Sequence, residues 1–369
     1  MKRILTLFLA IICLLSLFSC GKDEEYPPVE STDEEARVMM TIELDGEKYE
    51  VRYELYRALF LNFSKKYDKG DKSFWDTEAS ASAKTELNSR IISFCTDIFS
   101  ALHLSKKIGY DPYSAATDEK IKEYISKSVN GYSDNSGSFI GFDGNYDAYL
   151  ASLKEMNLNY SVQTLLLRYS IALDNINLYY AGTIDENDPT LDMKEGALIY
   201  TEEDVRSFYY GNESARVLLV TLDTKSYTEN RAKEIRDKMA TYTNAYSVSS
   251  YIVGFTATTP EDAFNGVLLG KYSLDSAYYS EIIKEAFSLA EGETGDVIRV
   301  STDTVSNYHI LYKTDKSDEY YSENYIDVRN VYIANRIGEL LNEVKLTLAE
   351  NVRRSELFDT IKHSEISMK

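Results

Sequence analysis

Few residues of this chain carry the chemistry of a catalytic or metal site. The 369 residues include only three histidines, His103, His309 and His363, and this scarcity argues against a histidine-rich metal site. The sequence contains no Gly-x-Ser-x-Gly, His-Glu-x-x-His, lysine-bearing phosphate loop or paired-cysteine motif. Paired carboxylates occur throughout a chain with 60 acidic residues, and solvated helix faces explain them. We therefore expect no cofactor, and a hydrolase is the weakest of the functions we consider.

One cysteine stands where covalent lipid attachment would occur. Residues 2 and 3 are basic, and the apolar run 4–18 is shorter than the roughly 20 residues that span a bilayer but suits a signal-peptide core. The run ends in Leu-Phe-Ser-Cys-Gly at 17–21, which resembles the lipobox of bacterial lipoproteins. That resemblance implies a signal peptide over 1–20 and lipid on Cys20, which would hold the chain on the extracytoplasmic face of a bacterial cell membrane. An ordinary signal peptide or an uncleaved anchor is the alternative.

Charge and cysteine content restrict the remaining possibilities. The formal net charge is −20, which gives no support for binding nucleic acid or anionic surfaces and favours basic clients. Cys13 lies in the signal segment, so Cys95 is the one thiol of the body, and its apolar neighbours predict a buried small side chain without a disulfide. The length predicts two domains.

The N-terminal part is predicted to be a spacer, a hairpin and a set of helices. Residues 21–37 are polar and acidic and contain a proline pair, which is typical of a disordered linker. Alternating apolar residues from 38 to 51 around Asp45-Gly46 predict a β-hairpin. Helical periodicity then extends to about residue 210, with a glycine-rich loop over 130–145. The predicted helices lie near 53–67, 77–105, 118–129, 145–156 and 162–180, and another begins at a capping box at Thr201.

After Gly211 the pattern changes to mixed strands and helices. Residues 217–222 form a β-prone apolar run, and strands are also predicted over 296–300 and 308–313. Helices are predicted over 228–242, from Pro260 onward, over 276–289, and over 322–362, where apolar residues fall on one helix face. The sequence therefore predicts an α+β protein with helical ends and a small sheet region between them.

Two stretches of this sheet region resemble the parvulin (PpiC-type) family of peptidyl-prolyl isomerases. Ala286-Phe287-Ser288-Leu289 leads through a Gly-Glu turn to a strand, and Tyr308-His309-Ile310-Leu311 is similar to the family's closing strand. Residues 214–220 look like the family's opening Ala-Arg-His-Ile-Leu-Val. The resemblance covers residues 213–315 and implies a small antiparallel sheet with flanking helices.

The order of segments is similar to that of extracytoplasmic foldases of the PrsA and SurA type. The resemblance implies an acidic linker over 21–37, a helical chaperone-like region over 38–210, a parvulin-like α/β domain over 211–316, and a C-terminal helix over 317–369 that packs on the N-terminal region. Neither helical part would then be a stable domain alone.

Isomerisation must lower a barrier of about 18–20 kcal/mol for rotation about a peptide bond. Parvulins use two facing histidines, an Asp or Cys in a glycine-bounded loop, and an apolar pocket for the proline ring. His309 matches the second histidine and is the catalytic candidate, while Val217 stands at the position of the first. Leu268, within Gly266–Gly270, stands at the acidic position. The substrate-binding candidates are Val217, Leu268, Tyr278, Ile282 and Phe287.

These departures predict a degenerate isomerase site, and a structural role for His309 is the alternative to a catalytic one. We expect a lipid-anchored chaperone or foldase that binds unfolded or partly folded exported proteins between the helical module and the lobe. The rival hypothesis is a non-enzymatic surface lipoprotein that binds glycans, since the chain has 31 tyrosines. Tyrosine pairs stand at 209–210, 278–279 and 320–321. The oligomeric state stays open.

Overall fold

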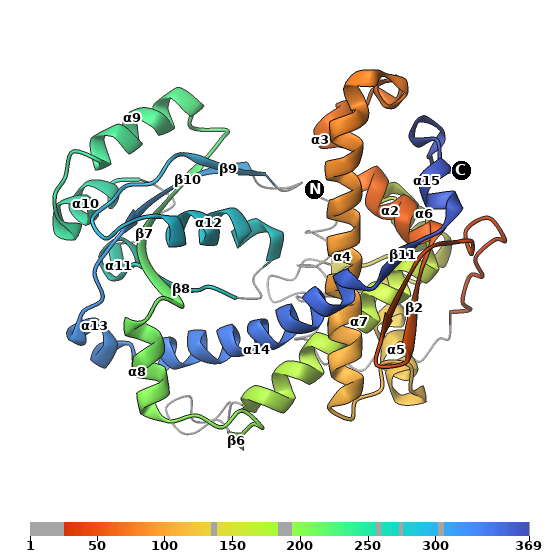
Figure 1. Cartoon of the computed structure of the whole chain (residues 1–369), viewed down its shortest axis with the longest axis horizontal. Helices are drawn as coiled ribbons and strands as arrows, with labels where there is room; N and C mark the ends of the chain where they lie inside the picture. The colour runs from red at the N-terminus through yellow and green to blue at the C-terminus, as the bar shows by residue number, and fades with distance from the viewer. Residues whose placement is uncertain are drawn as a thin grey trace.

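Two parts of unequal size make up the fold, a mainly helical body and a smaller sheet lobe (Figure 1). The coordinates are a computed structural model that describes residues 26–133, 139–183, 194–255, 260–272, 276–301 and 306–368. The predicted α+β class is confirmed. Within those ranges no helix combines the length and apolarity that a membrane span needs.

The body opens with the predicted hairpin, formed by β1 (Val38–Leu44) and β2 (Glu47–Arg52). Both turn residues have positive φ, 52° at Asp45 and 78° at Gly46, as a two-residue hairpin turn requires. The other edge of β1 pairs antiparallel with β11 (Val352–Arg354). The prediction of one helix to residue 362 is therefore wrong, because the chain leaves the helical conformation after Glu350 and satisfies the free backbone groups of β1.

Helices form most of the body, and side chains cap several of them. Ser114, Asn145 and Asn159 each accept a backbone N–H from the first turn of the helix that follows. The helices are α2 (Tyr53–Phe63), α3 (Lys65–Asp68), α4 (Ala81–Lys107), α5 (Ala115–Asn130), α6 (Tyr146–Glu155), α7 (Tyr160–Ala181), α8 (Glu202–Tyr210), α13 (Asp318–Glu323), α14 (Tyr325–Glu350) and α15 (Glu356–Thr360). Short pairs of strands are β3 (Tyr132–Ser133) with β4 (Phe139–Ile140), and β5 (Gly182–Thr183) with β6 (Lys194–Glu195).

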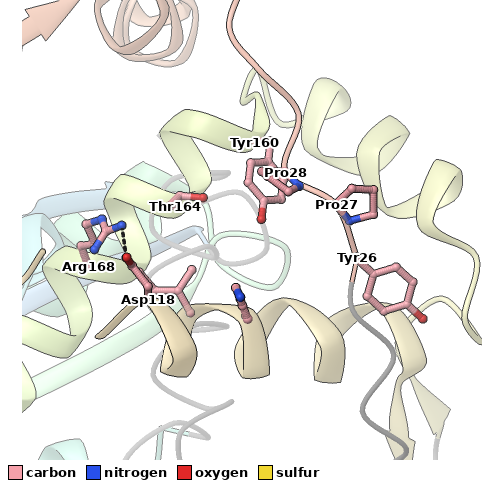
Figure 2. A pocket seen from close by; sticks show the side chains of 9 residues that line it. Tyr26, Pro27, Pro28, Asp118, Tyr160, Thr164 and Arg168 are labelled. Atoms are coloured by element: carbon pink, nitrogen blue, oxygen red, sulfur yellow. Dashed lines mark hydrogen bonds and ion pairs between the residues drawn. The ribbon is translucent and has the colours of Figure 1, made fainter. Parts of the chain in front are cut away.

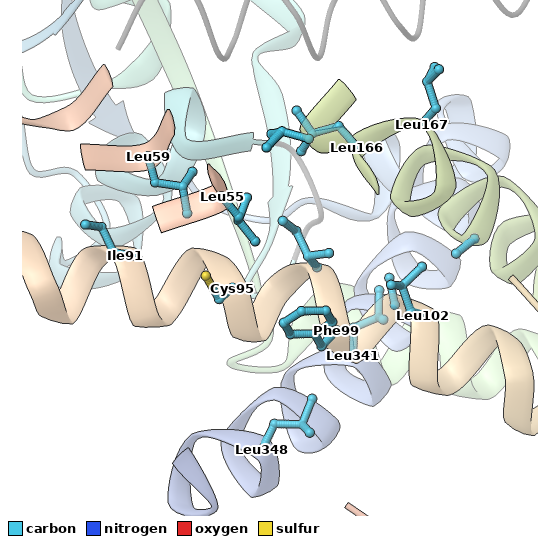
Figure 3. Close-up of a cluster of buried hydrophobic side chains, with 14 of the residues drawn as sticks. Leu55, Leu59, Ile91, Cys95, Phe99, Leu102, Leu166, Leu167, Leu341 and Leu348 are labelled. Atoms are coloured by element: carbon cyan, nitrogen blue, oxygen red, sulfur yellow. The ribbon is translucent and has the colours of Figure 1, made fainter. Parts of the chain in front are cut away.

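The body has one large hydrophobic core to which both ends of the chain contribute. On α4, Leu87, Ile91, Cys95, Phe99 and Leu102 are buried at helical spacing. They belong to the same cluster as the buried side chains of α7 and α14, which include Leu166, Leu341 and Leu348 (Figure 3). Cys95 is a free, fully buried thiol, as its neighbours predicted.

The lobe is a four-stranded antiparallel sheet in the order β8-β7-β10-β9. Its strands are β7 (Ser214–Asp223), β8 (Val267–Gly270), β9 (Ile298–Ser301) and β10 (Ser306–Lys313), and its helices are α9 (Glu229–Met239), α10 (Ala245–Ile252), α11 (Pro260–Asn265) and α12 (Ser276–Ser288). One face of the sheet packs on α9, α10 and α11, and the opposite face packs on α12. The alternation of side chains along β7 and β10 separates these two cores.

The lobe approaches α14 closely at two glycines. A Cβ atom at Gly338 of α14 would lie 1.6 Å from the carbonyl oxygen of Tyr272, just beyond β8. Beside it, the side-chain oxygen of the buried Asn335 accepts the backbone N–H of Tyr272 at 2.7 Å and leaves no room for a side chain at Gly270. At this contact the backbone of the lobe, just beyond β8, therefore packs directly against helix α14 of the body.

We expect Gly338→Ala to lower the free energy of unfolding by about 1–3 kcal/mol, because the methyl group must displace the Tyr272 carbonyl. In an open helix interior the same exchange stabilises by up to about 1 kcal/mol, so the sign of the change identifies the close approach. Urea unfolding measures it. Gly254→Ala, in the turn after α10, is the control for a glycine with free space, since its nearest neighbouring atom would lie 3.9 Å away. An equal loss in both variants would contradict this account.

Candidate isomerase and binding sites

His309, the catalytic candidate, is a buried residue of β10. Its side chain is 2% exposed, and its Nδ1 lies 3.1 Å from the hydroxyl of Thr221 on β7 in a hydrogen bond. Burial lowers the pKa of the imidazole to about 4, so the ring is neutral near pH 7. The burial and the bond to Thr221 therefore keep His309 as a neutral side chain packed on one face of the sheet.

The sheet does not place the two family histidine positions opposite each other. In the register of β7 and β10, His309 faces Thr221, whereas Val217 faces Lys313. Both positions lie on the face that packs on α12, but they are four residues apart, or about 13 Å along a strand. A histidine at position 217 would therefore not reach His309 directly.

Two of the predicted pocket residues on α12, Ile282 and Phe287, pack in the core between this helix and the sheet. Ile282 is fully buried and shares one cluster with Val217 and Leu311 of the sheet, with Phe287 packed against it. The side chain of Tyr278 lies outside the described residues, as does Cys20. Val217, Ile282 and Phe287 thus fill the interface between the sheet and α12.

Leu268 departs from its predicted place. The segment Gly266–Gly270 was expected to be a loop, but Val267–Gly270 is strand β8, with Leu268 opposite Arg216 of β7. Its side chain belongs to the large core of the body, while that of Leu269 belongs to the core between the sheet and α12. The apolar Val-Leu-Leu run explains the difference, because pairing with β7 buries it on both faces.

A group of aromatic and basic side chains joins the lobe to the body, and from the sequence only its tyrosine pairs were considered, for glycan binding. We call residues 206–216 and 314–321 the neck. Lys316 donates from Nζ to the carbonyl oxygens of Gly211 and Ser214, at 2.6 and 2.9 Å, and burial lowers its pKa to about 8. The guanidinium of Arg216 lies 4.0 Å from the ring centre of Tyr320. The chain therefore leaves and re-enters the body at one place.

The tyrosine pairs 209–210 and 320–321 are part of this neck. Tyr209 and Tyr320 stack with ring centres 6.0 Å apart, and Tyr209, Tyr320 and Tyr321 are buried. The guanidinium of Arg206 lies 5.3 Å from the ring centres of Tyr210 and Tyr321. These rings pack within the neck and do not form the flat exposed row that sugar binding would need.

The segment expected to be a disordered spacer is, from Tyr26 onward, fixed on the body. That part of the prediction is wrong, because the polar side chains of the segment find partners on the body. Glu35 pairs with Arg57 at 2.6 Å, and Ser31 donates to Glu54 at 2.6 Å. Tyr26 and the proline pair form one wall of an open cavity of about 520 Å³ between α5 and α7 (Figure 2).

The cavity is aromatic on one side and polar on the other. The ring of Tyr160 lies beside Pro28, and Arg168 is paired with Asp118 and donates to the Pro112 carbonyl at 2.6 Å (Figure 2). Thr164 Oγ1 has no hydrogen-bond partner among the described residues. Within those residues no group of three or more His, Cys, Asp or Glu side chains is arranged to hold a metal ion.

Acid should destabilise the protein partly through His309. Its folded-state pKa of about 4 is below the usual 6.5, so its contribution to stability is present above pH 6.5 and is lost as the pH falls toward 4. At pH 5 this loss lowers the free energy of unfolding by roughly 2 kcal/mol. We expect His309→Gln to remove this part of the pH dependence, as measured by urea unfolding at pH 7 and pH 5. His363 titrates in the same window and remains in both proteins, so an unchanged difference between the two pH values would contradict the assignment.

No protein-family model and no curated protein matches the chain. The solved structures that match include foldase structures of the PrsA type. The structure of foldase protein PrsA from Streptococcus pneumoniae is 14% identical, with a TM-score of 0.23, over 88% of this chain and 96% of that one. PrsA from Bacillus subtilis is 15% identical, with a TM-score of 0.24, over 89% and 98%. The peptidylprolyl isomerase PrsA from Bacillus cereus is 18% identical, with a TM-score of 0.22, over 90% and 99%. TM-scores of this size do not establish a shared fold.

Proposed function

We propose that this protein is a lipid-anchored, extracytoplasmic chaperone that binds unfolded or partly folded exported proteins and has no working isomerase site. The parvulin-like residues 213–315 support the assignment, since the described part of that range forms one sheet with helices on both faces. The lipobox-like sequence at 17–21 supports an anchor at Cys20 on the outer face of a bacterial cell membrane.

One observation carries the choice of binding over catalysis. Val217 and Ile282, two of the predicted substrate contacts, are both 0% exposed and pack in the same core, so neither is accessible to a proline ring. A catalytic site also needs polar groups that face the twisting amide. His309 instead bonds to Thr221 inside the sheet.

Exposed aromatic side chains on the lobe support client binding. Tyr246 of α10 and Phe264 of α11 are 74% and 44% exposed, and their ring centres lie 6.1 Å apart. Exposed aromatic side chains that lie next to each other offer apolar surface to an unfolded client. The glycan-binding alternative is less well supported, because Tyr209, Tyr320 and Tyr321 are buried in the neck.

The test combines two assays on the soluble form that lacks residues 1–20. We expect it to slow the aggregation of a chemically unfolded client and to leave the isomerisation rate of a proline-containing peptide at its uncatalysed value, because the expected pocket is closed. The double variant Tyr246→Ser, Phe264→Ser should lose aggregation suppression several-fold, whereas Leu346→Ser, at an exposed leucine of α14, should not.

His309→Gln and His363→Gln, which exchange two buried histidines, separate catalysis from packing. Isomerisation above the uncatalysed rate that disappears in His309→Gln but persists in His363→Gln would contradict a degenerate site. Failure of the natural protein to slow aggregation would contradict the chaperone.

A further inference from the structure

The N-terminal tether leaves the body at a fixed point. The hydroxyl of Tyr26 donates to Asn130 Oδ1 at 2.5 Å, and its ring stacks on that of Tyr146 with centres 5.1 Å apart. Tyr146 in turn donates from its hydroxyl to the carbonyl oxygen of Pro27 at 2.6 Å. The two prolines that follow Tyr26 restrict the backbone further. These contacts hold residue 26 against the end of α5 and the start of α6.

The length of the tether then restricts how the body can face a membrane. Five residues, 21–25, separate Cys20 from Tyr26. An extended chain spans at most about 3.3–3.6 Å per residue, so the tether reaches roughly 20 Å. This step rests on the proposed lipid at Cys20. With such a lipid, the face of the body around Tyr26 lies close to the bilayer surface.

Two exposed apolar side chains lie on that face. Phe139 and Ile140 of β4 are 54% and 45% exposed. They are next to the attachment point, because Gly131 directly follows Asn130 and a Cβ atom there would lie 2.3 Å from Phe139 Cζ. The strand pairing agrees, since Ile140 is opposite Tyr132. The tether therefore leaves the body beside the exposed Phe139 and Ile140 of the β3–β4 hairpin.

We propose that Phe139 and Ile140 insert into the headgroup region of the membrane to which Cys20 tethers the chain. Aromatic and apolar side chains favour this region. The net charge of −20 gives no attraction to anionic lipid, so the contact rests on apolar insertion. We assign the bilayer surface as the partner of Phe139 and Ile140 because the short tether keeps them close to it.

The experiment uses the full lipidated chain, reconstituted in vesicles of phosphatidylethanolamine and phosphatidylglycerol with brominated acyl chains. We expect Phe139→Trp to show several-fold stronger quenching by the bromines than Tyr246→Trp, an exposed aromatic position on the lobe. The native Trp75 is 1% exposed and contributes the same background to both. Ile140→Trp serves as a second probe if Phe139→Trp perturbs the hairpin. Equal quenching of the hairpin and lobe probes would overturn the proposal.

Further measurements distinguish a failure of membrane insertion from a failure of the proposed lipid anchor at Cys20. If the chain floats with the vesicles and loses flotation in Cys20→Ser, but the hairpin probes stay unquenched, only the membrane contact fails. If intact mass shows no acyl group on Cys20, both proposals fail. A blue shift of the Phe139→Trp emission that grows with protein concentration in the absence of vesicles would assign the hairpin to a second copy of the chain and overturn the membrane contact.

Discussion

The packing of α4 against α14 is the contact on which the rest of the structure depends. The two helices are more than 200 residues apart in sequence, yet their side chains belong to one core together with those of α7. Because both ends of the chain contribute to this core, the residues between must leave the body and return to it. The neck meets that constraint, with Lys316 bonded to Gly211 and Ser214.

This arrangement separates the tasks of the two parts. The body has a large core and a three-stranded sheet completed by β11, and the lobe strand β8 contributes only an apolar side chain, Leu268, to that core. The lobe has two smaller cores, one on each face of its sheet, and His309 contributes to the packing of one face. A binding surface on the lobe is compatible with both observations, and it needs no catalytic chemistry.

Local patterns predicted most helices and the first hairpin, because apolar spacing and capping residues act within a few residues. They did not predict β8, β11 or the fixed segment after Tyr26, since each of these is stabilised by partners distant in sequence. The same limit applies to the candidate site. His309 was placed correctly on a strand, but the distance between it and position 217 depends on strand register, which the sequence does not specify. The division of the chain into domains stays a prediction, because it concerns independent folding.

Deleting the lobe tests most directly whether one core unites the two ends of the chain. Residues 212–315 are replaced by a short Gly-Ser linker, which can close because the side-chain Nζ of Lys316 donates to the Gly211 carbonyl oxygen, so the two ends lie within the length of one lysine side chain. Urea unfolding, followed by circular dichroism, is compared with that of residues 38–210 alone. The account predicts cooperative unfolding of the lobe-deleted chain and no cooperative transition for 38–210. Cooperative unfolding of 38–210 by itself would contradict it.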